Sequence, residues 1–240
     1  MFNVGIISAG EGNRLKQEGI RVSKPLVPIK GIPLIQRIID VARNNGASSM
    51  SYIINETSKD LESFLKAYNY SQPFNLIVKT TESSLHSLYQ LNKFLSPPFL
   101  VSTADSVFLE NEFASFINFG LNVDGIDGII AVTDFIDDEK PLYADIDENG
   151  RIRNFEDVNE GYEFVTGGLY FFKNNIQKEI DEAVYSGVLR LRNFLRFLIQ
   201  KDYHFHAYPF SKIIDVDRVT DIEKAEEFLM KNLSENKECN

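Results

Sequence analysis

The chain has 240 residues, of which 43% are hydrophobic, as expected of a globular protein with a substantial core. Its formal net charge of −10 argues against a nucleic-acid-binding protein, but not against a nucleotide substrate, for which a few local cations and a metal ion suffice. Because the chain has one cysteine, Cys239, no signal-peptide pattern and no apolar run of membrane-spanning length, we expect a cytoplasmic protein.

The first half of the chain alternates predicted strands and helices. Strands are predicted at 4–8, 52–54, 74–78 and 99–103, and helices at 33–44, 59–67 and 85–95. This order is typical of a mostly parallel sheet covered by helices, in which ligands bind beyond the carboxyl ends of the strands. The loops that follow Ser8 and Thr103 lie at such ends and are therefore candidates for a binding site.

The second half is less regular and contains no internal repeat or clear linker. Strands are predicted at 129–133, 164–172, 203–208 and 213–216, a hairpin at 143–152, and helices at 188–199 and 221–231. The helix at 188–199 is so apolar that it is either buried or placed at a subunit interface, which leaves both a monomer and a homodimer open. We predict one α/β domain over residues 1–232, followed by a polar tail, 233–240, that frays.

The strongest local signal is the segment Ser8-Ala-Gly-Glu-Gly-Asn-Arg-Leu15, directly after the first predicted strand. Gly10 and Gly12 permit a tight turn and a close approach of a ligand to the backbone, whose N–H groups can bind an anion. The Arg14 guanidinium can hold phosphate oxygens through two hydrogen bonds, and Lys24 is a second candidate cation. A glycine-rich loop alone is equally consistent with a plain strand-to-helix turn.

A more specific pattern is the longer segment 9–39, AGEGNRLKQEGIRVSKPLVPIKGIPLIQRII. It resembles the opening signature of the sugar-phosphate nucleotidyltransferases, which include glucose-1-phosphate thymidylyltransferases and mannose-1-phosphate guanylyltransferases. The resemblance implies a single-domain, Rossmann-like, three-layer α/β/α sandwich with a mostly parallel mixed sheet. It also implies that Arg14 and Lys24 are catalytic, with Lys24 stabilising charge at the α-phosphate. The nucleotide-binding residues implied in the loop are Ser8, Ala9, Gly10, Glu11, Gly12 and Asn13.

Two aspartates are candidates to hold Mg²⁺, which needs only one or two protein carboxylates when phosphates and water fill its other positions. Asp105 follows the fourth predicted strand and resembles the family's strand-end aspartate. Asp217 resembles the first aspartate of a late family motif, and a predicted capping box of Thr220 and Glu223 leaves it available. Asp215 remains an alternative, because strand alternation places it on the same face as Asp217.

The acceptor side matches the family less closely. After the hairpin the family often has Glu-Lys-Pro, in which the glutamate binds sugar hydroxyls and the lysine binds the sugar phosphate. Glu156 matches the glutamate, but Asp157 and Val158 replace the lysine and the proline. Lys212 and Arg153 are candidates to replace that lysine, so the residue that contacts the acceptor phosphate stays open.

Two further segments match parts of the family. The stretch VTGGLYFF, residues 165–172, resembles the strand that lines the sugar pocket, which implies that Gly167 and Gly168 contact the acceptor, with Tyr143 as an apolar wall. A β-bulge at the two glycines is compatible with that role. Ser83 and Ser84 lie where the family recognises the base, in a segment closer to that of phosphocholine cytidylyltransferases. They are equally suited to cap the following helix.

These residues together predict a magnesium-dependent nucleotidyltransferase that moves a nucleoside monophosphate from a nucleoside triphosphate to a sugar 1-phosphate and releases pyrophosphate. A phosphate monoester is an adequate nucleophile near neutral pH, so positioning and charge neutralisation carry the catalysis. Two alternatives stay open. One is a cytidylyltransferase acting on a phospho-alcohol such as phosphocholine or an inositol phosphate, and the other is a nucleotide-sugar-binding module without turnover. The nucleobase is not predicted.

Overall fold

The computed structural model describes residues 1–10 and 12–238, and their side chains as far as Asn232, so Glu11 and Cys239 lie outside the described residues. The strands are β1 (Phe2–Ser8), β2 (Pro28–Ile29), β3 (Ile32–Pro33), β4 (Ala47–Ile54), β5 (Phe74–Val78), β6 (Phe99–Thr103), β7 (Ser106–Val107), β8 (Gly128–Thr133), β9 (Tyr143–Ile146), β10 (Ile152–Glu156), β11 (Phe164–Phe172), β12 (Phe205–Pro209) and β13 (Ile214–Asp215). The helices are α1 (Asn13–Gln17), the 3-10 helix η1 (Lys24–Leu26), α2 (Leu34–Asn44), α3 (Lys59–Ala67), α4 (Ser84–Asn92), α5 (Glu110–Asn122), α6 (Gln177–Tyr185), α7 (Leu191–Gln200) and α8 (Val219–Glu238).

One mixed sheet organises the described part of the chain. Its strands follow the order β10-β9-β11-β6-β1-β4-β5, with β8 paired to β11 and β12 paired to β8. Strands β6, β1, β4 and β5 run parallel to one another. Strand β11 runs antiparallel to β6, β8 and β9, and thus joins this parallel half to a half that is mainly antiparallel. The predicted mixed, mostly parallel sheet is confirmed.

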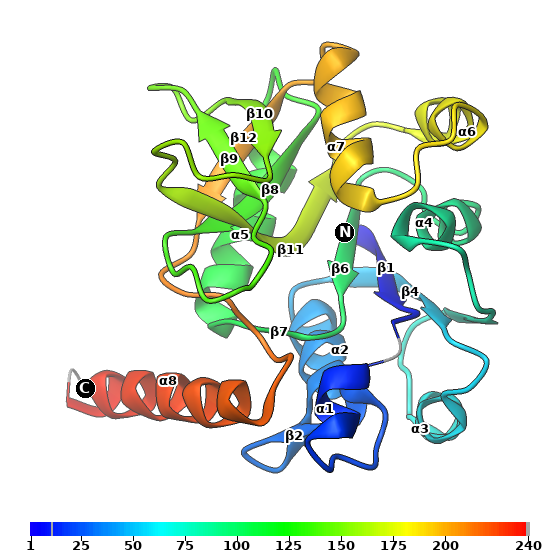
Figure 1. The fold of residues 1–240 in the computed structure, drawn as a ribbon, viewed down its shortest axis with the longest axis vertical. Coiled ribbons are helices and arrows are strands. Elements are labelled where there is room, and N and C mark those ends of the chain that lie inside the picture. The colour runs from blue at the N-terminus through cyan, green and yellow to red at the C-terminus, as the bar shows by residue number, and fades with distance from the viewer. Residues whose placement is uncertain (11, 239–240) are drawn as a thin grey trace.

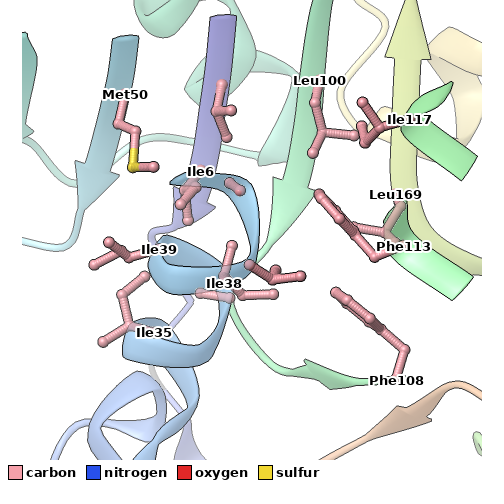
Figure 2. Packing of buried hydrophobic residues seen from close by; sticks show 14 of the residues in the cluster. Ile6, Ile35, Ile38, Ile39, Met50, Leu100, Phe108, Phe113, Ile117 and Leu169 are labelled. Carbon is pink, nitrogen blue, oxygen red and sulfur yellow. The ribbon is translucent and has the colours of Figure 1, made fainter. Parts of the chain in front are cut away.

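Helix α2 covers one face of the parallel half. Its apolar residues recur at helical spacing, so Ile35, Ile38 and Ile39 are all buried on one side of the helix. Figure 2 shows these side chains directed toward Ile6 of β1 and Met50 of β4. Full burial of one such side chain stabilises the fold by about 1.5–3 kcal/mol. Helices α3 and α5 contribute to the same hydrophobic cluster and complete this layer.

Helices α4, α6 and α7 cover the opposite face and form the third layer (Figure 1). The predicted helix at 188–199 corresponds to α7, which begins at Leu191. Its apolar residues Leu191, Phe194, Leu195 and Leu198 are buried against the sheet and the neighbouring helices of the same chain. The apolar face of this helix is therefore buried within the chain, and the predicted three-layer sandwich is confirmed.

Helix α8 extends away from the sheet (Figure 1). It ends at Glu238 and so takes in most of the segment predicted as a tail. The predicted capping box of Thr220 and Glu223 is wrong, because α8 begins at Val219 and Thr220 therefore lies inside the helix rather than at its N-cap. The carboxylate of Asp221 accepts hydrogen bonds from the N–H groups of Asp217 and Arg218, just before the helix. Like the other described helices, α8 lacks the combination of length and apolar composition needed to cross a membrane.

Candidate active site

Strands β1 and β6 lie side by side and end at the same edge of the sheet. Ile7 pairs with Thr103 in parallel register, so the glycine-rich loop and Asp105 leave the sheet together. Gly12 closes this loop in the left-handed region, with a φ of 62°. A Cβ atom on Gly12 would lie 3.0 Å from the Cβ of Lys24, so the glycine allows the loop to pack against that lysine.

Lys24 joins two aspartates that are far apart in the sequence. Its Nζ lies 2.7 Å from Oδ2 of Asp105 and also donates a hydrogen bond to Oδ1 of Asp217. The other oxygen of Asp217, Oδ2, lies 2.6 Å from Nη1 of Arg14. The Lys24 side chain is 14% exposed, so water only partly screens its ion pairs. The structure thus brings the four predicted charged residues into one group.

A short pair of strands explains how Asp217 reaches Asp105. Strands β7 and β13 pair antiparallel, with Ser106 opposite Asp215. Immediately beyond this pair, the N–H of Val216 donates a hydrogen bond of 3.0 Å to the carbonyl of Asp105. This backbone pairing carries the segment before α8 alongside the end of β6, so the two aspartates meet at the same edge of the sheet.

The charges in this group shift one another's pKa. Burial alone would lower the pKa of the Lys24 ammonium, but the carboxylates of Asp105 and Asp217 outweigh burial and raise that pKa above its ordinary value. Burial alone would likewise raise the pKa of Asp105, but the ammonium of Lys24 holds it below its ordinary value. Lys24 and Asp105 are therefore both ionised at neutral pH.

A cavity of about 400 Å³ opens beside the charged group, a volume typical of small-ligand sites. The hydroxyl of Ser8 is buried there without a hydrogen-bond partner in the described part of the chain, which leaves it available to a ligand. Ala9 does not line the cavity, and its carbonyl accepts a hydrogen bond from Asn55. The lining residues are Ile7, Ser8, Gly10, Gly12, Asn13, Arg14, Lys24, Pro25, Ala104, Asp105 and Asp217.

Asp215 has different surroundings from Asp217. Its Oδ1 accepts a hydrogen bond of 2.6 Å from the hydroxyl of Ser106, and it lines a small cavity of about 40 Å³ beside β11. Desolvation by the surrounding chain, followed by the charge of the nearby Asp105, raises the pKa of Asp215 to about 7, although the residue is still exposed to solvent on one side. Asp217, and not Asp215, therefore shares the ammonium of Lys24 with Asp105.

Strand β11 is interrupted at its two glycines. Its pairing with β8 shifts between Thr166 and Tyr170, which confirms the β-bulge. Gly168 has a φ of 75°, and a Cβ atom there would lie 2.6 Å from Oγ1 of Thr103. Gly167 lines the small cavity that also contains Asp215. The bulge therefore lets β11 approach the end of β6, immediately beside the charged group.

Two arginines of α7 hold the aspartate that replaces the family's lysine. Nη1 of Arg192 lies 2.7 Å from Oδ1 of Asp157, and Nη2 of Arg196 lies 2.9 Å from Oδ2. Asp157 and Arg192 line a cavity of about 580 Å³ together with Tyr143 and Glu139. Positive charge is thus supplied here by α7, rather than by the segment after β10.

The other predicted acceptor contacts lie elsewhere. Nζ of Lys212 lies 3.9 Å from the ring centre of Phe135, in a cavity next to α8. Arg153 is exposed on β10. The carboxylate of Glu156 accepts a hydrogen bond of 2.6 Å from the side-chain amide of Asn154. Asp157 pairs with Arg192 and Arg196 rather than with Lys212 or Arg153, and the residue that contacts the acceptor phosphate stays open.

Ser83 and Ser84 both accept hydrogen bonds from backbone N–H groups near the start of a helix. Ser83 caps α4 by accepting a hydrogen bond from the N–H of His86. The hydroxyl of Ser84 accepts a hydrogen bond of 2.9 Å from the N–H of Leu191, at the start of α7. Neither serine lines the cavity beside the glycine-rich loop. Ser83 therefore caps α4, whereas Ser84 binds the start of α7, and a contact of either serine with the base stays a prediction.

Glu139 and Arg218 extend the charged group and are not predicted from the sequence. One carboxylate oxygen of Glu139 lies 3.0 Å from Nη2 of Arg14, and the other accepts a hydrogen bond from Arg218. Arg218 directly follows Asp217, and this adjacency is its only sequence signal. Glu139 lies in the loop at 134–142, whose acidic composition suggests no more than a solvated surface. This loop therefore links the acceptor side to the glycine-rich loop.

Similar solved structures share this fold. The CTP:phosphocholine cytidylyltransferase of Streptococcus pneumoniae has a TM-score of 0.75 and 21% identity, with 95% of this chain and 98% of that chain covered. The inositol-1-phosphate CTP transferase of T. maritima has a TM-score of 0.77 and 18% identity, with 95% of this chain and 97% of that chain covered.

Sequence comparison identifies the family. The chain is 27% identical over 225 residues to the bifunctional protein GlmU of Thermodesulfovibrio yellowstonii, which covers 88% of this chain and 48% of that protein. The chain spans about half the length of the curated relatives that it matches. The family model described as nucleotidyl transferase matches residues 4–232. Because that match covers most of the chain, the protein belongs to the nucleotidyl transferase family, as its opening segment predicts.

Proposed function

We propose that this nucleotidyltransferase moves a nucleoside monophosphate from a nucleoside triphosphate to a sugar 1-phosphate, in a Mg²⁺-dependent reaction that releases pyrophosphate. The observation that carries the proposal is the meeting of Lys24, Asp105 and Asp217 beside the cavity of the glycine-rich loop. Two carboxylates and two cations at the carboxyl ends of parallel strands suit a substrate that is a metal-bound polyphosphate.

Asp105 and Asp217 fit a magnesium ion. Mg²⁺ prefers oxygen donors and is usually held by one or two carboxylates together with substrate phosphates and water. Both carboxylates converge on one point, the Nζ of Lys24. In the described residues, no group of three or more His, Cys, Asp or Glu side chains is arranged to hold a metal, so the triphosphate would complete the site. When bound, Mg²⁺ would neutralise the negative charge around the α-phosphate.

The side chains and the loop backbone have distinct roles in this proposal. The loop N–H groups and Arg14 hold the triphosphate, and Lys24 donates a hydrogen bond to an oxygen of the α-phosphate. A phosphate oxygen of the acceptor then attacks the α-phosphorus in line. A new P–O bond forms as the bond to the β-phosphate oxygen breaks, and pyrophosphate leaves with that electron pair. Because the acceptor is already anionic, the protein needs to position it rather than deprotonate it.

A cytidylyltransferase acting on a phospho-alcohol is the second candidate. Asp157, paired with Arg192 and Arg196, stands where the sugar-phosphate enzymes have a lysine, so the acceptor contact differs from theirs. The structures of similar fold include enzymes named for phosphocholine and for inositol 1-phosphate. Both observations support this second candidate, whereas the resemblance of the opening segment to sugar-phosphate nucleotidyltransferases supports the first.

A pyrophosphate-release screen tests the two candidates. ATP, CTP, GTP, UTP and dTTP would each be paired with glucose 1-phosphate, mannose 1-phosphate, phosphocholine and inositol 1-phosphate, with and without EDTA. Metal-dependent turnover with a sugar phosphate supports the first proposal, and turnover confined to CTP with a phospho-alcohol replaces it with the second. Binding of nucleotide-sugars without turnover of any pair would contradict both candidates and leave the binding module.

A further inference from the structure

Lys24 occupies the position that the proposed metal ion needs. Its Nζ contacts Oδ2 of Asp105 at 2.7 Å and Oδ1 of Asp217, the two carboxylates assigned above to Mg²⁺. We propose that Lys24 is an internal counter-ion that keeps a divalent cation out of the free protein until a nucleoside triphosphate binds. This role depends on the proposed function and adds to it the order in which metal and nucleotide bind.

Three of the four carboxylate oxygens of Asp105 and Asp217 already have a cationic partner among the described residues. Oδ1 of Asp217 accepts a hydrogen bond from Lys24, and Oδ2 accepts one of 2.6 Å from Arg14. A magnesium ion sits about 2.0–2.1 Å from each ligand oxygen. A divalent ion bound to the same oxygens would therefore lie very close to the Lys24 ammonium, where like charges repel strongly. Lys24 and the metal thus exclude each other from this position.

The segment around Lys24 keeps the ammonium in place. Lys24 begins η1, with Pro25 next in the chain, and its side chain is 14% exposed. The glycine-rich loop packs against the lysine stem, because a Cβ atom on Gly12 would lie only 3.0 Å from the Cβ of Lys24. A side chain packed in this way loses little further conformational entropy when it pairs with a carboxylate. Lys24 therefore competes for the aspartates more effectively than a freely moving surface lysine would.

A nucleoside triphosphate offers new partners to both cations. Lys24 and Arg14 line the cavity beside the glycine-rich loop, and phosphate oxygens accept strong hydrogen bonds from either side chain. When the cations turn to the phosphates, Asp105 and Asp217 lose their partners and become available to a divalent ion. Metal and nucleotide should therefore bind with positive coupling, each raising the affinity for the other by the same factor.

Mn²⁺ binding measured by electron paramagnetic resonance tests this coupling, because Mn²⁺ takes the same oxygen donors as Mg²⁺. The probes are Mn²⁺ alone and Mn²⁺ with the α,β-methylene analogues of ATP, CTP, GTP, UTP and dTTP, after correction for metal bound to the free analogue. We expect the wild-type protein to bind Mn²⁺ about tenfold more tightly with the preferred analogue than without it. In the absence of nucleotide, Lys24→Met should bind Mn²⁺ about tenfold more tightly than wild type.

Matched variants separate this role from general charge effects and from misfolding. Lys16 is exposed on α1, so Lys16→Met removes the same charge and should leave Mn²⁺ affinity at the wild-type value. Lys24→Gln, which keeps a polar side chain of similar reach, repeats the measurement if the methionine variant does not fold. Unchanged affinity for Mn²⁺ alone in the folded Lys24 variants would overturn the counter-ion role and leave the proposed function standing. Failure of the wild-type protein to bind Mn²⁺ with any analogue would instead contradict the proposed metal-dependent function itself.

Discussion

The proposed nucleotide side and the proposed acceptor side of the site differ in how their charges are neutralised. On the nucleotide side, Lys24 contacts both Asp105 and Asp217, and Arg14 contacts Asp217 as well. On the acceptor side, three aspartates line the small cavity beside β11, and Asp215 among them has a pKa raised to about 7 by desolvation and by Asp105. The first arrangement suits phosphates and a metal ion. In the second, Lys224 pairs with Asp137, whereas the carboxylate of Asp215 forms no ion pair with the described residues and accepts a hydrogen bond only from a neutral hydroxyl, that of Ser106.

This difference in charge corresponds to the difference between the parallel half and the mainly antiparallel half of the sheet. The charged group of the nucleotide side lies where the parallel strands β1 and β6 end, so its residues come from loops at fixed positions. The acceptor side is built from the loop at 134–142, the bulge of β11 and the start of α7. We infer that the parallel half carries the phosphate chemistry common to the family, and that the other half selects the acceptor.

Removing a carboxylate from the nucleotide side should have the largest effect. Asp105→Asn removes one of the two proposed metal ligands and one of the two carboxylates that contact Lys24. We expect kcat for pyrophosphate release to fall about 10³-fold, or about 4 kcal/mol, with the folded state preserved as judged by circular dichroism. Asp138→Asn removes a carboxylate that lines the acceptor-side cavity and should lower kcat less than about tenfold. Equal losses of kcat in the two variants would contradict the proposed difference between the nucleotide side and the acceptor side.

A clash at the junction of the two sides should have the next largest effect. Gly168 has a φ of 75°, and its added Cβ atom would meet Oγ1 of Thr103 at 2.6 Å. We expect Gly168→Ala to lower the free energy of unfolding by about 2–3 kcal/mol in urea titrations, and to lower kcat by displacing the end of β6.

Gly161→Ala is the matched control for Gly168→Ala. Gly161 has a φ of 103°, but an added Cβ atom there would have no neighbour within 4 Å. Gly161→Ala should therefore lower the free energy of unfolding only by the cost of the backbone conformation, about 1 kcal/mol, and the variant should remain active. A Gly168 variant as stable and active as the Gly161 variant would show that β11 and β6 need not approach closely.

A smaller effect is expected from the acceptor side alone. Arg192 contacts Asp157 and lines the same cavity as Glu139, whose carboxylate reaches Arg14. If Arg192 supplies the charge that a lysine supplies in related enzymes, Arg192→Ala should raise KM for the acceptor about tenfold, or about 1.4 kcal/mol. KM for the nucleotide should stay unchanged, and the exposed Arg153→Ala should alter neither constant. A rise in KM for the nucleotide instead would show that Arg192 contributes to nucleotide binding and not to acceptor binding.

Much of the fold can be predicted because most elements carry their own periodicity. The predicted spans 59–67, 74–78 and 99–103 coincide with α3, β5 and β6. Helix α5 has Phe113, Phe116, Ile117 and Gly120 buried at helical spacing, so the sequence carries its periodicity although no helix is predicted there. Helix α6 buries only Ile180 and Ala183, which leaves a weak apolar stripe. Strands β7 and β13 have two residues each, too few for any periodicity to appear.

The residues of the candidate site likewise fall into those that a local motif identifies and those whose role depends on tertiary packing. Arg14, Lys24 and Asp105 stand in loops directly after strands or in the opening signature, so a local motif is enough to find them. The roles of Glu139 and Arg192 depend on where the loop at 134–142 and α7 pack, which local sequence does not specify. Asp217 is preferred to Asp215 from the late family motif alone, but its contact with Lys24 depends on the long-range pairing of β13 with β7, which local sequence does not specify.

The smallest expected effect concerns Asp215, and its sign follows from its pKa. An unfolded aspartate has a pKa of about 3.9, whereas Asp215 in the folded protein has a pKa of about 7, so between these values the folded state holds the extra proton. Stability therefore falls as pH rises through this window, and the loss is complete above pH 7. Asp215→Asn keeps an oxygen for the hydroxyl of Ser106 and cannot ionise. Solvent screening reduces the loss of wild-type stability to about 1 kcal/mol. In metal-free buffer with EDTA, the difference in Tm between Asp215→Asn and wild type should therefore increase by about 2–4 °C from pH 5 to pH 8. A Tm difference independent of pH would mean that the acceptor-side carboxylates are compensated as well as those around Lys24, and the contrast between the two sides would disappear.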